Sequence, residues 1–364
     1  MIIYFIYFIV LAIIAVEYEL NPFKSNGLLI FITLSLALLA GLRGQEVSRD
    51  YLPYQYAFDN IQEFIGNGSI MNFGIYEPGF IGIVILFKFF FIQNYGVAIM
   101  LFFAIGSVAM KIFVIDRFSI NPYLVILLYF SHYFIIHEMT QIRIGFASAI
   151  FLVSLIFYFK NNYKAYIGMI LVATMFHYSA FGYLLLLLFN KTSFNLYFYS
   201  ALILSAIILG FLRLPLFNFA GGILSSFDNN GKIDAYSTLM EFNLVDDVKV
   251  FNFINLAKII CTLYLMFLIP KAQLLRDSHL IFFLKCNILS IFTLSLFSGV
   301  PLIAFRISDL YGVISMFNFA YLARYLPFSK YNIWIVVLIA GLLFYLNAIH
   351  GGLLNPYKMI KIIK

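Results

Sequence analysis

Residues 95–115 read YGVAIMLFFAIGSVAMKIFVI, a run of 21 residues in which Lys111 is the only charged side chain. About 20 consecutive and mostly apolar residues make a helix long enough to cross the hydrocarbon core of a membrane. Similar apolar runs recur from one end of the chain to the other. This repeated pattern decides the fold class, because each run needs an apolar environment on all sides.

The composition of the whole chain agrees with this interpretation. Of its 364 residues, 63% are hydrophobic and only 11% are charged, whereas roughly a quarter of the residues in an ordinary soluble protein are charged. So few charges could not cover the surface of a soluble protein of this length. The composition therefore excludes a cytosolic enzyme, a disordered protein and a nucleic-acid-binding module.

We expect an all-α, polytopic integral membrane protein that forms a single transmembrane domain over residues 1–364. The runs predict about 12 transmembrane helices, with a range of about 10 to 13. They are Met1–Val16, Gly27–Leu42, Ile75–Ile92, Tyr95–Ile115, Pro122–Ile136, Ile144–Phe159, Tyr166–Phe189, Leu196–Leu212, Val250–Ile269, Leu280–Val300, Pro301–Leu322 and Tyr331–Ile349.

Two longer polar stretches, residues 43–77 and 214–249, interrupt the apolar runs. Each contains two basic and five acidic residues, so each has a net charge of −3. Loops of this length are uncommon unless they bind or catalyse. We expect both loops on the outer face, because cytoplasmic linkers tend to be rich in Lys and Arg. The linkers that suggest this contain Lys24, Lys160, Lys164, Lys191, Lys271, Arg276, Arg324 and Lys330.

The number of spans does not agree with this placement unless one run fails to cross. Four expected spans separate the first polar loop from Lys160, which would put Lys160 outside as well. We therefore expect that one run between Glu77 and Phe159 does not cross. The stretch Tyr163–Phe189 could also break at His177 and return to its own side. The basic residues of the C-terminal tail, Lys358 among them, are not explained by this placement.

Ionisable residues inside apolar runs are functional candidates, because burying them in a membrane costs several kcal/mol. Each candidate also has a structural interpretation: Arg43 could extend to the membrane surface, Arg306 could pair with Asp309, and His177 could be satisfied by one hydrogen bond. We expect three lysines near helix ends to reach the surface in the same way: Lys88, Lys111 and Lys258. The candidates are Arg43, Arg143, His177, Lys285 and Arg306, with Asp50 and Glu77 at the mouth of the first loop.

The remaining motifs narrow the chemistry. The segment His-Glu-Met-Thr-Gln at 137–141 lacks the second histidine of an HExxH zinc site, and no Gly-rich phosphate loop with a lysine is present. We therefore expect neither a metal nor another cofactor. Arginines suit a phosphate or pyrophosphate leaving group, because they neutralise the charge that develops on it. A carboxylate or a histidine would accept the proton of an incoming hydroxyl.

Several motifs, in this order, resemble the EpsG/Wzy-type family of bacterial exopolysaccharide and O-antigen polymerases. Gly-Leu-Arg at 41–43 and Arg-Asp-Tyr-Leu-Pro-Tyr at 49–54 are similar to the first external loop of that family. Three further motifs are Tyr-Glu-Pro-Gly-Phe at 76–80, Ile-Arg-Ile-Gly-Phe-Ala-Ser-Ala-Ile at 142–150 and Phe-His-Tyr-Ser-Ala at 176–180. The chain departs from the family at Ser48-Arg49-Asp50, where Gly-Thr-Asp is usual, and at Ile144, where Gln is frequent. These departures leave the sugars of the repeat unit unidentified.

The resemblance implies a metal-independent glycosyltransferase of the bacterial inner membrane. Such an enzyme moves a growing glycan from undecaprenyl pyrophosphate onto the non-reducing end of a lipid-linked repeat unit at the outer, periplasmic face. The partners implied are the lipid-linked oligosaccharide, membrane lipids, and a flippase and a chain-length regulator of the same pathway, with no nucleic acid.

The resemblance also implies roles for individual residues. Arg43, Arg143 and Arg306 would hold pyrophosphate, and either Asp50 or His177 would be the base. The expected catalytic set is Asp50, His177 and Arg143, and the expected substrate-binding set is Arg43, Arg306, Tyr51, Tyr54, Glu77 and Gln141.

Two other functions fit the sequence. A membrane glycosyltransferase that uses a lipid-phosphate sugar would also place an acid in an early external loop, but it would add a single sugar. A lipid-linked oligosaccharide flippase would perform no chemistry, and such transporters tend to carry internal repeats and paired Gly or Pro breaks. No such repeat is evident in this sequence. Membrane O-acetylation of the glycan is a third possibility, for which only His177 argues.

Overall fold

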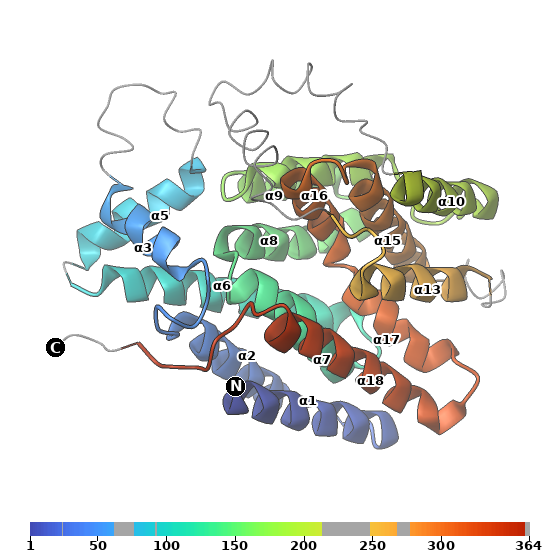
Figure 1. The fold of residues 1–364 in the computed structure, drawn as a ribbon, viewed down its shortest axis with the longest axis horizontal. Coiled ribbons are helices and arrows are strands. Elements are labelled where there is room, and N and C mark those ends of the chain that lie inside the picture. Colours follow the sequence, from blue (N-terminus) through green and yellow to red (C-terminus); the bar gives the residue numbers. More distant parts are fainter. Residues whose placement is uncertain (24, 62–75, 92, 213–247, 268–276, 361–364) are drawn as a thin grey trace, which may run out of the picture. The chain divides into compact units, whose positions relative to one another are not determined.

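The computed structural model contains two compact units, and Figure 1 follows the chain through its helices. Unit 1 comprises residues 1–184 and 319–364, and unit 2 comprises residues 185–318. The described residues are 1–23, 25–61, 76–91, 93–212, 248–267 and 277–360. The second polar loop expected from the sequence, residues 214–249, lies outside the described residues except for its last two positions.

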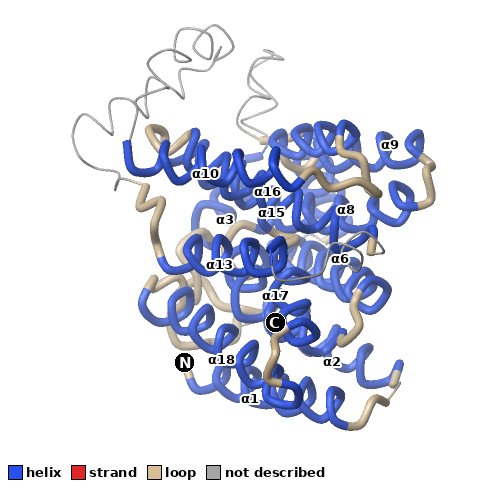
Figure 2. Tube along the Cα trace, turned by 90° about the vertical axis from the view of Figure 1, so that its right-hand side faces the viewer, coloured by secondary structure: helices blue, strands red, loops and turns tan. Residues whose placement is uncertain are grey.

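Every regular element in the described part of the chain is a helix (Figure 2), which confirms the all-α expectation. The helices of unit 1 are α1 (Ile2–Leu20), α2 (Asn26–Gly41), α3 (Tyr51–Asp59), α5 (Pro78–Phe90), α6 (Tyr95–Phe118), α7 (Pro122–Tyr129), the π-helix η2 (Phe130–Glu138), α8 (Ile142–Phe159), α9 (Tyr163–Thr174), η4 (Ser329–Tyr331), α18 (Asn332–Phe344) and the π-helix η5 (Tyr345–His350). The helices of unit 2 are α10 (Leu196–Leu212), α13 (Phe253–Phe267), α15 (Ser278–Leu296) and α16 (Pro301–Gly312). The 3-10 helix η3 (Tyr178–Leu188) and α17 (Ser315–Tyr325) cross the boundaries between the two units.

Five helices among the described residues are long and apolar enough to cross a membrane, and six shorter apolar helices accompany them. This agrees with a multi-pass membrane protein, while the expected number of about 12 spans stays a prediction. The five are Ile2–Leu20, Tyr95–Phe118, Ile142–Phe159, Ser278–Leu296 and Ser329–His350.

Local sequence signals explain where several helices begin. The Ser25 hydroxyl accepts a hydrogen bond from the backbone N–H of Leu28 at 3.2 Å at the start of α2. The Asn121 side chain does the same for α7, and Pro122 occupies the first helical position, where no backbone N–H is needed. Within an apolar environment these caps satisfy donors that water cannot reach.

One end of unit 1 is built from residues 42–50, the start of α1 and the segment 351–360, and we call it the arginine end. The backbone N–H of Gly44 donates to the carbonyl oxygen of Lys358 at 2.7 Å, and the N–H of Ile360 donates to Leu42 at 2.9 Å. The Tyr4 ring lies 6.1 Å from the Tyr357 ring. Lys358, from the basic tail that the sequence left unexplained, therefore lies at the same end as residues 43–50 of the first polar loop. Lys361, Lys364 and residues 62–75 of that loop lie outside the described residues.

The long helices of unit 1 connect the arginine end with the opposite end. A Cβ atom on Gly41 would lie 2.6 Å from Leu101, so the end of α2 packs closely against the first turns of α6. After α6, Asn121 donates hydrogen bonds to the carbonyl oxygen of Ala15 and to Glu19, near the end of α1. The turn between α6 and α7 therefore lies at the opposite end.

Helix α5 does not cross unit 1, although the sequence predicted a spanning helix over Ile75–Ile92. Lys88, in its last turn, donates to the carbonyl oxygens of Phe58 and Asp59, at 3.0 and 2.9 Å, where α3 ends. The start of α5 adjoins the start of α8, where Glu77 pairs with Arg143. Both ends of α5 are thus at the arginine end, and its 13 residues extend over only about 20 Å.

The stretch Tyr163–Phe189 breaks at His177, as the sequence also suggested. Helix α9 ends at Thr174, and η3 returns beside it: the Tyr166 hydroxyl donates to the carbonyl oxygen of Tyr183 at 2.7 Å. The Tyr183 ring also stacks on Phe151, with 3.5 Å between the ring centroids. With α5 not crossing, the turn between α8 and α9, which contains Lys160, and the first turn of α9, which contains Lys164, lie opposite the arginine end. Within unit 1, the number of crossing helices therefore agrees with the expectation that Lys160 and Arg43 lie at opposite ends.

Helix α15 is the most buried element of unit 2, and it packs against α10, α13 and α16. Polar side chains join these helices: Ser290 donates to the carbonyl oxygen of Ser308 at 2.8 Å, and Asn287 donates to Thr262 at 2.7 Å. Lys285 donates to two carbonyl oxygens of the loop that follows η3, those of Asn190 and Ser193. Lys285, a functional candidate from the sequence, therefore has a structural role in this unit.

Candidate functional site

Arg43 follows the end of α2 and is completely buried. Its Nη1 donates to the carbonyl oxygen of Ala40 at 2.5 Å, and its Nε donates to the Ser48 hydroxyl at 3.3 Å. The guanidinium also lies over the Tyr51 ring, 5.8 Å from the centroid. Its Nη2 has no hydrogen-bond partner. Because an unpaired buried donor is costly, this nitrogen is suited to bind a ligand oxygen.

Asp50 occupies the N-cap position of α3, but its side chain makes no capping hydrogen bond there. Burial raises the pKa of its carboxyl group, and the charges of Arg43, Arg49 and Arg143 oppose that rise. Three guanidinium groups therefore act electrostatically on one carboxyl group. A carboxylate with a raised pKa is a better proton acceptor than an ordinary one, so Asp50 is suited to act as a base.

Arg143 stands in the first turn of α8, and its Nη1 forms an ion pair with Glu77. The Tyr54 hydroxyl also acts on it electrostatically. The guanidinium lies over two rings, 5.0 Å from the centroid of Tyr76 and 5.5 Å from that of Phe80. Its Nε is buried without a hydrogen-bond partner. Arg143 thus resembles Arg43 in keeping one N–H available.

The tyrosines expected to contact substrate are part of an aromatic cluster. Tyr51 and Tyr54 are buried in α3, and burial raises the pKa of both hydroxyls. The Tyr54 ring lies 6.4 Å from Phe58 and 6.1 Å from Phe80. Because its ring is covered on these sides, Tyr54 acts on the site through its hydroxyl and Arg143.

His177 lies where α9 turns into η3, and the Glu-Pro-Gly-Phe motif packs against this turn. The N–H of Gly79 donates to the carbonyl oxygen of Met175 at 2.8 Å, and a Cβ atom on Gly79 would lie 2.7 Å from that oxygen. Only glycine allows this approach. The Nδ1 of His177 lies 2.6 Å from the Ser179 hydroxyl and accepts the N–H of Ser179 at 3.3 Å. His177 therefore stabilises the turn itself.

The two remaining residues of the expected site differ in their positions. Gln141 is exposed, directly before the first residue of α8 and two positions from Arg143. Arg306 is exposed on α16 of unit 2. Its approach to Arg43 and Arg143 stays a prediction. The structure thus brings together Arg43, Asp50, Tyr51, Tyr54, Glu77 and Arg143, all within unit 1.

Sequence reasoning missed a buried polar network in unit 1. Lys111 was expected to reach the membrane surface, which is wrong: it is completely buried and pairs with Glu138 at 2.5 Å. The Tyr129 hydroxyl donates to the same Glu138 oxygen at 2.8 Å. The Nδ1 of His137 lies 3.4 Å from Lys111 and 3.3 Å from the Ser148 hydroxyl. An acid beside a histidine in one apolar run, and a lysine in another, were the available signal.

This network holds the start of α8, which carries Arg143. The hydroxyls of Ser107 and Ser148 both donate to the carbonyl oxygen of Gly145, at 3.0 and 2.8 Å. A Cβ atom on Gly145 would lie 2.9 Å from a carboxylate oxygen of Glu138. Glu138 also acts electrostatically on Arg43. The network therefore holds the helix start that carries Arg143, and through Glu138 it acts electrostatically on Arg43.

Within the described residues, no group of three or more His, Cys, Asp or Glu side chains is placed to hold a metal ion. Among known proteins, neither a curated sequence nor a solved structure matches the chain. The model of the EpsG family, in contrast, matches residues 26–359, which is nearly the entire sequence. The chain therefore belongs to the EpsG family.

Proposed function

We propose that the protein is a metal-independent polysaccharide polymerase that transfers a growing glycan from undecaprenyl pyrophosphate onto the non-reducing end of a lipid-linked repeat unit. Membership of the EpsG family supports a polymerase-type function in polysaccharide synthesis. The apolar helices support a multi-pass membrane protein. The donor lipid, the acceptor and the reaction are those that the resemblance to this family implies, and the arginines of the site in unit 1 suit a pyrophosphate leaving group.

The observation that carries the proposal is the unused hydrogen-bonding capacity of two arginines. Nη2 of Arg43 and Nε of Arg143 are both buried and unpaired. Both guanidinium groups act on the carboxyl group of Asp50. Pyrophosphate oxygens would satisfy these donors, and two guanidinium groups would neutralise charge that develops on a departing pyrophosphate.

In the proposed reaction Asp50 accepts the proton of the acceptor hydroxyl. The hydroxyl oxygen bonds to the anomeric carbon of the donor glycan as the bond from that carbon to the pyrophosphate oxygen breaks. The electron pair of the broken bond stays on the pyrophosphate, beside Arg43 and Arg143. Of the two sequence candidates for the base, Asp50 is favoured, because His177 already engages Ser179 through Nδ1.

The other residues of the site have supporting roles in this proposal. Glu77 and Tyr54 fix the direction of the Arg143 guanidinium. Gln141 and Tyr51 line the approach to Arg143 and Arg43. For Arg306, in unit 2, the resemblance to the family implies a role in binding pyrophosphate.

We propose that the arginine end faces outward from the bacterial inner membrane. At the opposite end of unit 1, Arg117 lies in the last turn of α6, Lys160 follows α8 and Lys164 lies in the first turn of α9. Basic residues at the ends of helices favour the cytoplasm. A flippase would then deliver the lipid-linked repeat unit to the arginine end, and a chain-length regulator would act on the same product.

The test uses a producing strain that lacks the gene and carries variants on a plasmid. Arg43→Lys and Arg143→Lys keep the charge but remove the fork of donors. Each should reduce polymerisation by about 100-fold, the loss typical of a missing oxyanion donor. Glycan ladders on a gel, normalised to the amount of protein in the membrane, measure the effect. Arg117→Lys, at the opposite end of unit 1, is the matched control.

The outcomes separate the competing functions. A polymerase defect leaves exported single repeat units, whereas a flippase defect strands the repeat unit on the inner leaflet. Addition of one sugar without ladders would indicate a glycosyltransferase that uses a lipid-phosphate donor. Ladders of normal length in both Lys variants, at normal protein levels, would refute the proposed site.

A further inference from the structure

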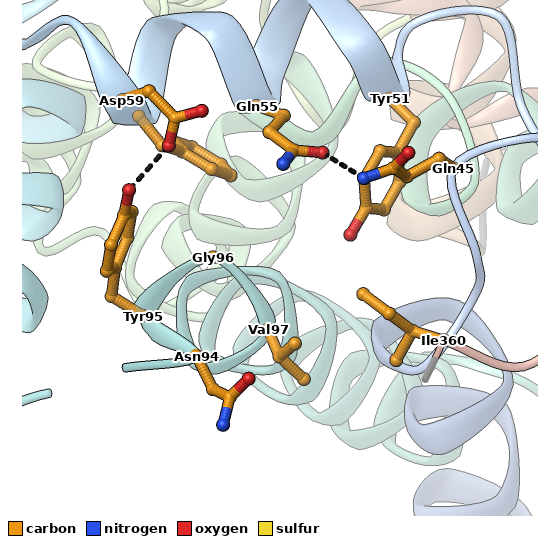
Figure 3. A pocket seen from close by; sticks show the side chains of 10 residues that line it. Gln45, Tyr51, Gln55, Asp59, Asn94, Tyr95, Gly96, Val97 and Ile360 are labelled. Carbon is orange, nitrogen blue, oxygen red and sulfur yellow. Dashed lines mark hydrogen bonds between the residues drawn. The ribbon is translucent and has the colours of Figure 1, made fainter. Parts of the chain in front are cut away.

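A pocket of about 280 Å³ lies beside α3 at the arginine end of unit 1 (Figure 3). Helix α3 contributes Tyr51, Gln55 and Asp59, and the start of α6 contributes Asn94 and Tyr95. Gln45, from the loop before α3, lines it as well. Neither Arg43 nor Arg143 lines the pocket, whereas Tyr51, which faces Arg43, does. The pocket therefore adjoins the arginines on the same unit.

The chemistry of the pocket differs from that of the arginine site. Its polar side chains are amides, tyrosine hydroxyls and one carboxylate, and its ten lining residues include no basic side chain. Amides both donate and accept hydrogen bonds, and a carboxylate accepts them. A sugar ring presents hydroxyls that do both. An anionic ligand would lack a counter-charge among these residues and would face Asp59, so an uncharged ring fits best.

The walls of the pocket are held in place by contacts that a ligand need not break. The Tyr95 hydroxyl donates to Asp59 at 2.5 Å, and the Gln45 and Gln55 amides bond each other at 2.5 Å (Figure 3). Lys88 holds the end of α3 from behind, and its ammonium lies 5.1 Å from the centre of the Tyr95 ring. A preformed pocket loses less entropy on binding than one that must be assembled.

The start of α6 adds backbone donors. The side chain of Asn94, at the N-cap, makes no capping hydrogen bond. The next residues, Gly96 and Val97, also line the pocket, and N–H groups in the first turn of a helix have no partner within the helix. Oxygen atoms of a sugar substituent could accept hydrogen bonds from them.

Tyr51 connects the pocket with the arginine site. Its ring lines the pocket and also faces the guanidinium of Arg43. Asp50, the proposed base, is the preceding residue. A glycan whose terminal hydroxyl reached Asp50 could therefore continue into the pocket.

We propose that this pocket is a sugar-binding subsite, which holds an uncharged ring of the repeat unit away from the reacting hydroxyl. The role in polymerisation rests on the proposed function, whereas the binding of a sugar does not. The ring belongs either to the acceptor or to the donor glycan, and the kinetics of polymerisation distinguish the two.

Two variants remove pocket contacts with little effect on the fold. Gln55→Ala deletes a half-buried amide. Asn94→Gly deletes the second, and glycine tolerates the positive φ of 61° at that position. Leu52→Ala is the matched control, because Leu52 is exposed on the same helix but does not line the pocket.

The first arm measures binding alone. Purified full-length protein in detergent is mixed with the lipid-free repeat-unit oligosaccharide, released by mild acid from a strain that accumulates single units. Saturation-transfer NMR should detect binding to the wild type and to Leu52→Ala. We expect the signal to fall severalfold in Gln55→Ala and Asn94→Gly. Glucose and glucuronate serve as probes of charge, and glucose should give the stronger signal.

The second arm measures polymerisation in proteoliposomes with the purified lipid-linked single repeat unit. In both pocket variants we expect KM to rise about tenfold while kcat stays unchanged, which is the effect of removing uniform binding. Lipid-free repeat unit should inhibit the wild type by competing as an acceptor, and inhibition should weaken in the variants if the pocket holds the acceptor. Inhibition unchanged with a raised KM assigns the pocket to the donor glycan.

The two proposals fail in different ways. If the pocket variants match Leu52→Ala in both arms, the subsite is refuted, while ladder synthesis by the wild type still supports the polymerase. If the wild type makes no polymer, the proposed function fails, and the NMR arm still decides whether the pocket binds sugar.

Discussion

Two ion pairs adjoin the start of α8, and they differ in how completely the protein satisfies them. In the pair of Lys111 and Glu138 the side chains are 0% and 1% exposed, and Tyr129 adds a second hydrogen bond to the same carboxylate oxygen. In the pair of Arg143 and Glu77 they are 19% and 6% exposed, and Nε of Arg143 has no partner.

The difference separates a structural pair from a candidate ligand site. A buried pair whose charges are matched inside the protein needs nothing further, and it fixes the helices that supply it. A pair at the edge of the protein with an unused donor is incomplete until a ligand oxygen arrives. Charge and burial alone would have ranked Lys111 above Arg143, whereas the unsatisfied donor reverses that order.

The largest expected effect concerns the buried pair of Lys111 and Glu138. Lys111→Met leaves Glu138 buried without its counter-charge, and breaking one partner of such a pair typically costs about 3–5 kcal/mol. We expect a strong loss of folded protein in the membrane, measured as abundance and as the unfolding temperature in detergent.

The double variant Lys111→Met with Glu138→Gln provides the control. It removes both charges while the Gln amide can still bond Tyr129, so most of the lost stability should return. An unchanged unfolding temperature in Lys111→Met alone would contradict the structural role of the Lys111–Glu138 pair.

The next largest effect concerns Asp50, which is half-buried beside Arg43 and Arg143. Asp50→Asn should lower the polymerisation rate by about 100-fold or more, because an amide cannot accept the proton. Burial raises the pKa of this carboxyl group, so the acid limb of the wild-type rate should lie above the ordinary value for Asp of about 4. Rates in proteoliposomes over a range of pH measure both.

Ionisation of Asp50 should favour activity but lower the stability of the folded protein. A raised pKa in the folded state means that ionised Asp50 costs stability, fully above that pKa and not at all below the unfolded value. Asp50→Asn should therefore unfold at a temperature no lower than the wild type near neutral pH, and this advantage should vanish in acid. A variant that is both inactive and much less stable would argue for a structural carboxylate instead.

The smallest effect belongs to a third pair, Glu46 with Lys358, whose side chains are 71% and 68% exposed. Lys358→Ala should leave ladders unchanged, because exposed pairs contribute little and backbone hydrogen bonds still hold the segment to Gly44 and Val47. The hydrogen bond from Lys358 lowers the pKa of Glu46. Its small contribution to stability is thus present above the ordinary pKa of Glu and lost as the pH falls.

Unfolding curves of the wild type and Lys358→Ala at several pH values check this. The difference between them should be slight near neutral pH and should disappear in acid. A large loss of ladders in this variant would give the C-terminal segment a direct part in the reaction.

Much of the site could be predicted from local motifs. Arg43, Asp50, Glu77 and Arg143 were identified in separate segments, because each stands at a break in an apolar run. The direction of Arg143 toward Glu77, across 66 residues, could not be predicted. Whether Ile75–Ile92 crosses also could not, because a helix near the surface and a spanning helix share the same composition.

The sequence by itself determined the helical membrane class, the two acidic stretches and the family, because hydropathy and short motifs are properties of consecutive residues. Only the tertiary structure decided that Lys111 is enclosed, that α5 stays at one end of unit 1, and that the C-terminal segment packs beside Arg43. The physical reason is that whether a polar group is satisfied depends on partners that lie far away in sequence. The same lysine in an apolar run reaches the membrane surface or pairs internally according to what another helix supplies.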